Sequence, residues 1–548
     1  MSRPHVLIVG AGGVFGSRLA RLLARRQLFR LSLGGRDAGR VAALQAELRQ
    51  IDGQGEYGFV QIDRTSAGPD LLRELACLVV VDCAGPFQGS STALIEAAIA
   101  ARCNYIDIAD SRAFVAEISR FDAAAKAAGI AVLTGASTTP ALSHAVIESI
   151  AAGWRQIDSI DVAIAPGNRA PKGRAVIAAI LSWVGQPVRV FREGIWQQAR
   201  GWSGTRKVQI DGLTSRRVAL AEVPDLDLMA SRFRPRVRAG FEAGMELGLI
   251  HGSVGLAGLA VRLKLVRSAT AFAGLGTWVA NLLGRVGTDT GGMLVEVAGL
   301  DQRLETKVVR WSLKATAGDG PYVPVLAAAA AVLALARGRH IVGAQPAVGL
   351  LSLEDIKAWT TGLAIETKTA SFKREVPLYA RVMGPAFAAL PEVTQRLHRG
   401  RPALIVEGQA AVIGARNWAG RLVAAMFGMP REASNVPVRV VIEARDGREY
   451  WTRFFDGKPM RSVMSRADEG VIEERFGAIA ICMVLVPRAD GLDMVRSSGR
   501  IGSIPIPGFL LPRIKAEERV EGQRHRFDVD IALPVIGRLV AYRGWLEL

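Results

Sequence analysis

The chain opens on Val6-Leu7-Ile8-Val9-Gly10-Ala11-Gly12-Gly13-Val14-Phe15-Gly16, the stretch that decides its fold. Four apolar residues predict a buried strand, and the helical spacing of the apolar residues that follow predicts a helix, so the glycines occupy the turn between them. Gly10 permits a tight turn, Gly12 and Gly13 let the backbone approach a pyrophosphate, and Gly16 allows close helix packing. We therefore predict a dinucleotide site at the helix N-terminus, contacted by Gly10, Ala11, Gly12, Gly13, Val14, Phe15 and Gly16. The alternative is a glycine-rich turn without a ligand.

Strand-like and helix-like segments continue to alternate as far as Thr134. This alternation predicts a Rossmann domain, an α/β fold with a doubly wound parallel sheet. Besides the first strand, the apolar runs predict strands at 31–33, 59–62, 78–81, 105–108 and 130–133.

Arg36 follows the second predicted strand, about twenty residues after the glycine loop, where NAD-binding domains usually present an acidic residue to the ribose. A guanidinium at this place can bind a 2′-phosphate with two hydrogen bonds. We predict NADP as the cofactor in preference to NAD, with Arg36 as a contact. Asp37 is the alternative ribose ligand, and a solvated surface charge is the alternative role for Arg36.

Three further loops follow strands of the same predicted sheet and should meet at its carboxyl edge, where ligands bind in open α/β folds. The first of them, Ala84-Gly85-Pro86-Phe87, should lie beside the nicotinamide. Hydride transfer to a carbonyl or imine also needs a proton donor, and Asp110 and His144 follow the fifth and sixth strands. We name both as candidate catalytic residues. The alternatives are a helix cap for Asp110 and a packing role for His144.

The length of 548 residues exceeds what one hydrophobic core supports, so we expect about three domains. We place a Rossmann domain at 1–150, an α+β substrate or dimerisation domain at 151–385 and an antiparallel β-rich domain at 390–548. The turn-rich segment 343–349 is expected to bring the chain back against the first domain. We expect a homodimer only because symmetric dimers are the commonest oligomers, and not because of any feature of this sequence.

The β-rich prediction for the last domain rests on Asp-Gly pairs at 446–447, 456–457 and 490–491, each lying between runs rich in β-branched or aromatic residues. Such pairs predict a meander of hairpins, either closed or sandwiched. Its interior could be an ordinary packed core or could enclose an apolar ligand.

Two apolar stretches, 268–284 and 320–336, are about as long as the shortest membrane-spanning helices. We expect both to be buried helices, with peripheral membrane contact as the alternative. The net charge of +18 favours anionic partners, but the basic residues are scattered, so we expect no nucleic-acid binding.

Four cysteines without C-x-x-C spacing, and six dispersed histidines, predict neither a disulfide framework nor a metal site. The N-terminus has no cleavable apolar segment. We expect a cytoplasmic protein, with a membrane-peripheral location as the alternative.

The first 150 or so residues resemble the saccharopine dehydrogenase-like NAD(P)-binding oxidoreductases. The resemblance rests on the glycine loop, the Ala84–Phe87 turn, Tyr105-Ile106-Asp107 and the loop from Gly135 to Pro140. The region from about 390 to 548 resembles an uncharacterised domain that is sometimes fused behind such proteins.

Our expectation is an NADP-dependent oxidoreductase that acts on a small or lipid-like substrate. The resemblance implies its fold and cofactor more than its reaction. It does not name that substrate, because the lysine and histidine arrangement of a saccharopine-forming enzyme cannot be located here. The alternative function is a non-catalytic NADP(H)-binding protein that associates with membranes or lipids.

Overall fold

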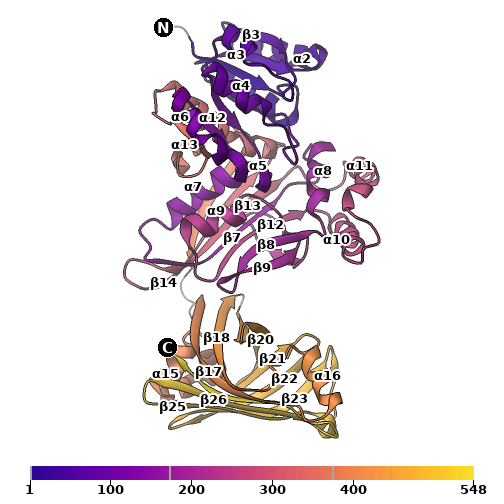
Figure 1. Ribbon diagram of the computed structural model, residues 1–548, viewed down its shortest axis with the longest axis vertical. Helices are drawn as coiled ribbons and strands as arrows, with labels where there is room; N and C mark the ends of the chain where they lie inside the picture. Colours follow the sequence, from indigo (N-terminus) through magenta and orange to yellow (C-terminus); the bar gives the residue numbers. More distant parts are fainter. Residues whose placement is uncertain (1–2, 172–173, 373–375, 401, 446) are drawn as a thin grey trace. The chain divides into compact units, whose positions relative to one another are not determined.

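The computed structural model describes residues 3–548 except 172–173, 373–375, 401 and 446 (Figure 1). Its internal contacts divide the chain into two compact units. Unit 1 comprises Met1–Val297 and Val309–Ser371, and unit 2 comprises Ala298–Val308 and Phe372–Leu548.

The N-terminal part of unit 1 is built on a seven-stranded sheet of order β15-β6-β5-β4-β1-β2-β3, in which every neighbouring pair is parallel. All six predicted strands form, so the predicted Rossmann sheet is confirmed. The strands are β1 (His5–Val9), β2 (Arg30–Gly35), β3 (Tyr57–Gln61), β4 (Val79–Asp82), β5 (Asn104–Asp107), β6 (Ala131–Thr134) and β15 (Gly343–Pro346).

Helices connect these strands and bury the apolar positions that predicted them. In α1, for example, Leu19, Leu22 and Leu23 point into the core. The connecting helices are α1 (Val14–Arg25), α2 (Ala38–Ile51), α3 (Pro69–Leu75), α4 (Ala93–Ala101), α5 (Arg112–Glu117) and α6 (Asp122–Ala128), and α7 (Ser143–Ile150) follows the sixth strand.

The chain returns to the first sheet through the segment 343–349, as its turn-rich composition predicted, and adds an edge strand to it. Strand β15 pairs in parallel with β6, with Gly343 opposite Ala131. Before it, α12 (Val323–Ala336) is almost entirely buried, which confirms the expectation for the second apolar stretch. The preceding Tyr322 ring packs under the Arg18 guanidinium of α1.

The rest of unit 1 is an α+β region around a nine-stranded sheet, whose main path is β10-β11-β12-β7-β13-β14-β16. Its strands are β7 (Gln156–Ala165), β8 (Pro187–Arg192), β9 (Ile195–Arg200), β10 (Arg206–Val208), β11 (Arg216–Leu220), β12 (Arg238–Met245), β13 (Gly291–Leu300), β14 (Thr306–Ala315) and β16 (Ile365–Phe372). Its helices are α8 (Arg174–Trp183), α9 (Asp225–Phe233), α10 (Gly248–Arg262) and α11 (Ala273–Leu282), and α13 (Leu353–Lys357) contacts α12.

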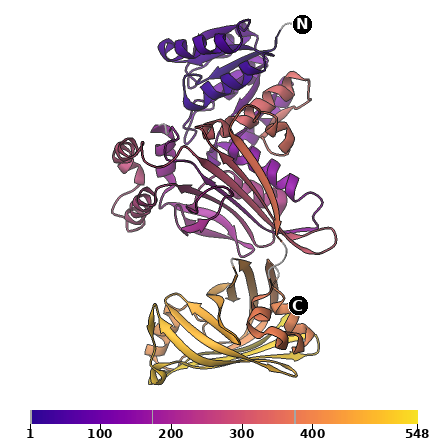
Figure 2. The same cartoon turned by 180° about the vertical axis from the view of Figure 1, so that it is seen from behind.

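The expectation of burial is wrong for the apolar stretch 268–284. Its helix α11 lies beside α8 and near α10 on one flank of unit 1 (Figures 1 and 2), and it leaves Leu275, Trp278 and Leu282 exposed. One face of α11 packs against α8, and no described element of unit 1 covers the opposite face. Among the described residues, no helix is both long and apolar enough to cross a bilayer.

Unit 2 is dominated by one antiparallel sheet that closes on itself, because β22 pairs with β23 as well as with β21. The order β22-β21-β20-β19-β18-β17-β27-β26-β25-β23 forms a ring of ten strands, here called the C-terminal barrel, and the short β24 extends β23. Its strands are β17 (Ala403–Gly414), β18 (Ala433–Arg445), β19 (Arg448–Phe455), β20 (Lys458–Asp468), β21 (Val471–Phe476), β22 (Ile479–Arg488), β23 (Gly491–Ile501), β24 (Ile504–Pro505), β25 (Arg513–Glu521), β26 (Arg524–Leu533) and β27 (Gly537–Glu547).

The predicted antiparallel β-rich domain is confirmed, and it is closed. The Asp456-Gly457 pair forms the β19–β20 turn with positive φ at both residues, as its composition predicted. Asp446, from the first predicted pair, lies outside the described residues. Three short helices accompany the barrel: α14 (Leu378–Met383), α15 (Glu392–His398) and α16 (Trp418–Met426).

Candidate functional site

The glycine loop has the geometry that a dinucleotide requires. Gly10 adopts a positive φ of 80°, and its N–H donates to the Gly34 carbonyl at 2.9 Å. A Cβ on Gly16 would lie only 2.3 Å from the Gly10 carbonyl oxygen, so only glycine allows α1 to begin this close to β1.

The N-terminus of α1 is open to an anion. Gly13 is the N-cap residue and supplies no capping side chain, and the first turn contains no acidic residue. The N–H groups of a first helical turn have no partner within the helix, and Gly12 and Gly13 are exposed beside them. This cradle fits a diphosphate bound through backbone N–H groups.

Two exposed arginines follow β2. Arg36 is exposed directly after β2, as the sequence predicted. Arg40, one turn into α2, is also exposed, and its Cβ would lie 3.3 Å from a Cβ on Gly12. Asp37, the alternative ribose ligand, instead caps α2 by accepting from the Gly39 N–H at 2.9 Å. Arg40 was not predicted from the sequence, although its spacing from Arg36 on a predicted helix was visible.

The Ala84–Phe87 loop lies against the glycine loop, because a Cβ on Gly10 would come within 3.0 Å of Ala84. The Ala84 N–H donates to Asp82 at the end of β4. Phe87 is buried, with its ring 5.4 Å from that of Phe114, so this side chain anchors the loop from beneath. The remaining residues of the loop are the ones free to face a ligand.

A buried ion pair that was not predicted from the sequence supports the carboxyl edge of the first sheet. Arg64 bonds Asp82 through Nε at 2.8 Å and through Nη2 at 2.7 Å, and its guanidinium also lies over the Phe87 ring. Asp82 is fully buried. The pair ties the loop after β3 to the loop after β4, and no local pattern indicates it because the partners are 18 residues apart.

Asp107 connects the loops that follow β5 and β6. Its Oδ1 accepts from the N–H groups of Ala109 and Gly135 and from the Thr134 hydroxyl, all within 2.9 Å. Its Oδ2 is buried and has no hydrogen-bond partner among the described residues. Burial raises the pKa of this carboxyl to about 6, which keeps part of the population protonated near neutral pH.

Asp110 lies in the same group of loops and is exposed. Its carboxylate accepts a hydrogen bond from Gln88, which follows the Ala84–Phe87 loop, at 3.3 Å. The surrounding protein raises the pKa of this carboxyl although the side chain remains open to solvent. Ser111, rather than Asp110, caps the helix that follows, so Asp110 is free of the capping role that was its alternative.

His144 is fully buried in α7. Its Nδ1 lies 2.9 Å from the Pro140 carbonyl oxygen, and burial lowers its pKa to about 4, so the ring is neutral at physiological pH. The carboxylate of Asp225, at the start of α9, contacts the hydroxyls of Thr139 and Ser143. Burial raises the pKa of Asp225 to about 7. This placement favours Asp110 over His144 as a group that a substrate could reach.

Comparison with known proteins agrees with this geometry. Residues 6–133 match the family described as the saccharopine dehydrogenase NADP binding domain. The N-terminal domain is of this NADP-binding type. The match supports NADP as the cofactor and supports a saccharopine dehydrogenase-like oxidoreductase. Residues 390–546 match a domain of unknown function, DUF4166, and no curated protein matches the chain.

Similar solved structures include saccharopine dehydrogenase (L-Glu forming) from Saccharomyces cerevisiae, at 12% identity and a TM-score of 0.49, covering 67% of this chain and 100% of that one. A short-chain dehydrogenase from Sphingobium yanoikuyae in complex with NADPH has 24% identity and a TM-score of 0.20, covering 24% of this chain and 69% of that one. At such identities and scores, neither likeness indicates the substrate of this protein.

Proposed function

We propose that this protein is an NADP-dependent oxidoreductase that transfers a hydride to or from a small or lipid-like substrate at the carboxyl edge of the first sheet. The glycine loop carries the proposal, because Gly16 brings α1 close enough to β1 for free N–H groups to receive a diphosphate. Arg36 and Arg40 support NADP over NAD, since Arg36 is exposed directly after β2 and Arg40 is exposed beside Gly12.

The cofactor supplies or accepts the hydride when bound. The glycine loop binds its diphosphate, and the two arginines neutralise the 2′-phosphate. Asp82 and Asp107 hold the loops of the edge in place through their backbone contacts. Asp110 exchanges the proton that accompanies hydride transfer, and its raised pKa favours the protonated form that a general acid needs.

The test is NADPH oxidation by the purified chain with a panel of carbonyl, imine and enoyl compounds. Asp110→Asn should lower kcat about a hundredfold or more while leaving NADPH affinity unchanged, since general acid catalysis contributes on the order of 10²–10⁴ in rate. Glu117→Gln, an exposed change on the following helix, is the control. Undiminished turnover by Asp110→Asn would remove Asp110 from the mechanism, and tight NADPH binding without turnover on the whole panel would favour the non-catalytic alternative.

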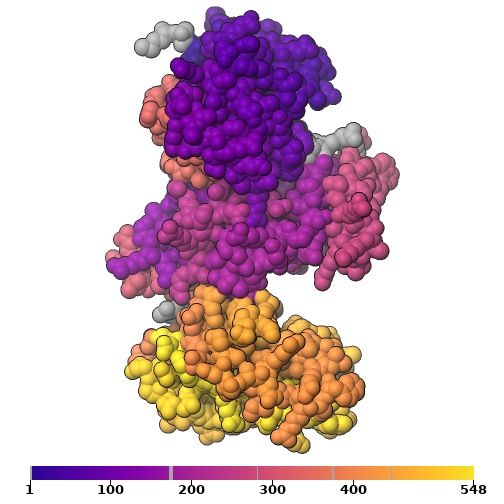
Figure 3. All heavy atoms as spheres, in the orientation of Figure 1, coloured from indigo at the N-terminus to yellow at the C-terminus, as the bar shows by residue number. Residues whose placement is uncertain are grey.

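A second proposal, peripheral binding to an anionic membrane, is supported by α10 and α11. Leu249 and Leu256 are 86% and 69% exposed and, with Leu263, recur every seven residues along one face. On α11, Trp278 is 61% exposed between the exposed Leu275 and Leu282. These helices lie on the flank of unit 1 that protrudes at the right in Figure 3.

Exposed basic residues accompany these apolar side chains: Arg262, Lys264, Arg267 and Arg285. Apolar side chains flanked by cations are the usual composition of a surface that inserts shallowly into anionic lipid. We call the exposed leucines, Trp278 and these cations the flank patch.

The flank patch is tested by co-sedimentation with vesicles of phosphatidylcholine, alone or mixed with phosphatidylglycerol. Binding should require phosphatidylglycerol, and Leu256→Asp with Trp278→Asp should abolish it. Leu28→Asp, an equally simple change at another exposed leucine of unit 1, should have no effect. Absence of binding by the unmodified chain, or equal binding by the double variant, would contradict the proposal.

A further inference from the structure

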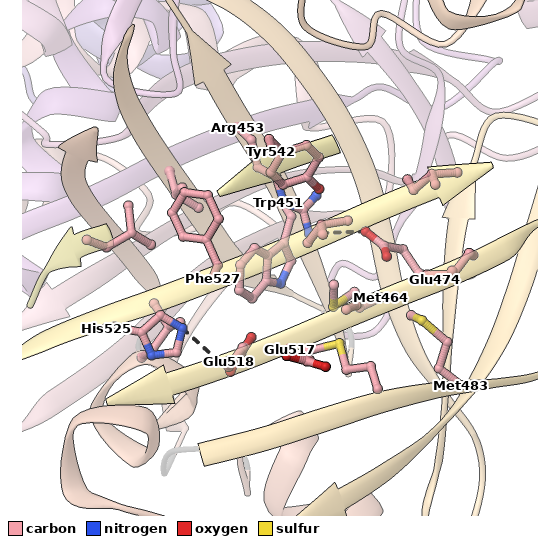
Figure 4. Close-up of a pocket in the computed structure, with 18 of the residues that line it drawn as sticks. Trp451, Arg453, Met464, Glu474, Met483, Glu517, Glu518, His525, Phe527 and Tyr542 are labelled. Atoms are coloured by element: carbon pink, nitrogen blue, oxygen red, sulfur yellow. Dashed lines mark hydrogen bonds and ion pairs between the residues drawn. The ribbon is translucent and has the colours of Figure 1, made fainter. Parts of the chain in front are cut away.

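The C-terminal barrel is not filled by its own side chains. It encloses a cavity of about 100 Å³, whose walls include Trp451, Met464, Met483, Met494, Phe527 and Tyr542 (Figure 4). Barrels of about eight strands are just wide enough for side chains to fill or for one small ligand, and this ring has ten. An apolar cavity of roughly 150 Å³ in another protein binds benzene, so the cavity of the barrel is nearly large enough to hold one aromatic ring.

Polar groups stand among these apolar walls. Arg453, on β19, points into the interior, donates from Nη1 to Ser462 at 2.9 Å and from Nη2 to Glu474 at 3.1 Å. These bonds use two of the five guanidinium N–H donors. The Tyr542 hydroxyl also lines the cavity, and burial raises its pKa to about 12, so it remains a neutral donor.

A second set of polar side chains includes Glu518 on β25 and His525 on β26, across the ring of strands from β19. Glu518 contacts His398 Nε2 at 2.8 Å and His525 Nε2 at 3.6 Å. His525 lines the cavity and is 1% exposed, and its Nδ1 has no hydrogen-bond partner among the described residues. A buried ring nitrogen without a partner costs free energy, which a ligand could recover by bonding it.

Folding of the barrel does not explain these groups, since replacing a buried ion pair by well-packed apolar side chains of similar volume is often neutral or even stabilising. A domain that needed only a core would fill its interior with apolar residues. Charged and unpartnered groups around an empty space are instead the composition of a ligand pocket, which combines apolar walls with a few placed polar groups.

The charges indicate what kind of ligand fits. Arg453 is the one cation of this lining set, and it faces three carboxylates, those of Glu474, Glu517 and Glu518. Burial would raise the pKa of Glu518, but the neighbouring His398 and His525 hold it below its usual value, so this carboxylate is ionised. Even if His398 and His525 were both protonated, the summed charge would only reach zero. An anion therefore finds no net attraction, whereas a neutral oxygen can accept from Arg453.

We propose that the C-terminal barrel binds, inside its cavity, a small uncharged organic molecule: a single ring or short chain bearing one carbonyl or hydroxyl oxygen. The apolar part contacts Trp451 and Phe527, and the oxygen accepts from the Arg453 guanidinium and the Tyr542 hydroxyl. Three methionines in the wall allow it to adapt to ligands of different outline. This site is separate from the dinucleotide site and does not depend on the proposed oxidoreductase activity.

Calorimetric titration of the full chain with acetophenone, benzyl alcohol and benzoate tests the proposal. Acetophenone and benzyl alcohol should bind, and benzoate should bind at least about tenfold more weakly, because desolvating its charge is not compensated. Tyr542→Phe removes only the hydroxyl and should weaken acetophenone binding by roughly two- to tenfold, the effect of one neutral hydrogen bond. Tighter binding of benzoate, or no binding of any of the three, would overturn the proposal.

A matched pair of substitutions locates the ligand. Ala516 lines the cavity, so Ala516→Phe should fill it and abolish binding, whereas Ala411→Phe, on the exposed face of β17, should leave binding unchanged. If Ala516→Phe fails to fold, 5-fluorotryptophan labelling gives the second measurement. The ¹⁹F resonance of Trp451, assigned with Trp451→Phe, should shift with acetophenone while that of Trp202 in unit 1 does not. The opposite pattern would place the ligand elsewhere.

Discussion

Replacing Gly16 by alanine tests the glycine loop with a single methyl group. The added Cβ would lie 2.3 Å from the Gly10 carbonyl oxygen and 2.9 Å from the Ala11 Cα. Real Cβ atoms essentially never approach closer than 3.0 Å, so the start of α1 must move away by at least 3.0 − 2.3 = 0.7 Å.

This displacement is enough to break the contacts on which binding depends. An N–H that donates to a phosphate oxygen at about 2.9 Å would then be about 3.6 Å away, which no longer counts as a hydrogen bond. A hydrogen bond to a charged group contributes about 1.5–3 kcal/mol. Loss of one such bond therefore weakens NADPH binding by roughly ten- to a hundredfold.

Calorimetric titration with NADPH measures this loss, and thermal unfolding measures the accompanying strain. Gly255→Ala in α10 is the control, because a Cβ there meets nothing within 4 Å and alanine favours a helix by up to about 1 kcal/mol. The control should bind NADPH normally and melt no lower than the unmodified protein. If Gly16→Ala binds NADPH as tightly as the control, the helix N-terminus is not the diphosphate site.

Two further predictions concern selectivity and pH. Arg36→Ala should weaken NADPH binding about tenfold or more and leave NADH binding almost unchanged. Equal losses for both dinucleotides would contradict the assignment of Arg36 to the 2′-phosphate. The control is Arg49→Ala, a change at an exposed residue at the far end of α2. The raised pKa of Asp225, about 7, means that ionising its carboxyl destabilises the folded protein, and that this cost is relieved as the pH falls from about 7 towards the unfolded value near 4. The melting temperature of Asp225→Asn, measured relative to that of the unmodified protein, should therefore be higher at pH 8 than at pH 5. A difference that does not change with pH would count against the ionisation of Asp225.

The first sheet could be predicted almost completely from the sequence, because each of its central strands is a continuous apolar run buried on both faces. In the C-terminal barrel, strands with alternating composition were harder to find. Arg513–Glu521 was missed because its outward positions are all charged, and even its inward face carries Glu518. This segment forms a strand because it pairs with β26, the next strand along the chain, and with β23, which precedes it.

The candidate site was predicted where its residues follow one another along the chain, as in the glycine loop. It was missed where residues meet only through the fold. Arg64 reaches Asp82 across two strands, and Asp225 reaches Ser143 from the start of α9, 82 residues along the chain. Neither residue belongs to a local pattern. The exposure of α11 was also misjudged, since an apolar helix that packs on one face has the same composition as a buried one.

Titration of the unmodified full chain with NADPH and NADH by calorimetry, at near-physiological salt, tests most directly whether a dinucleotide binds at the start of α1. One NADPH per chain, bound more tightly than NADH, is the predicted result. The absence of heat with either dinucleotide would contradict it.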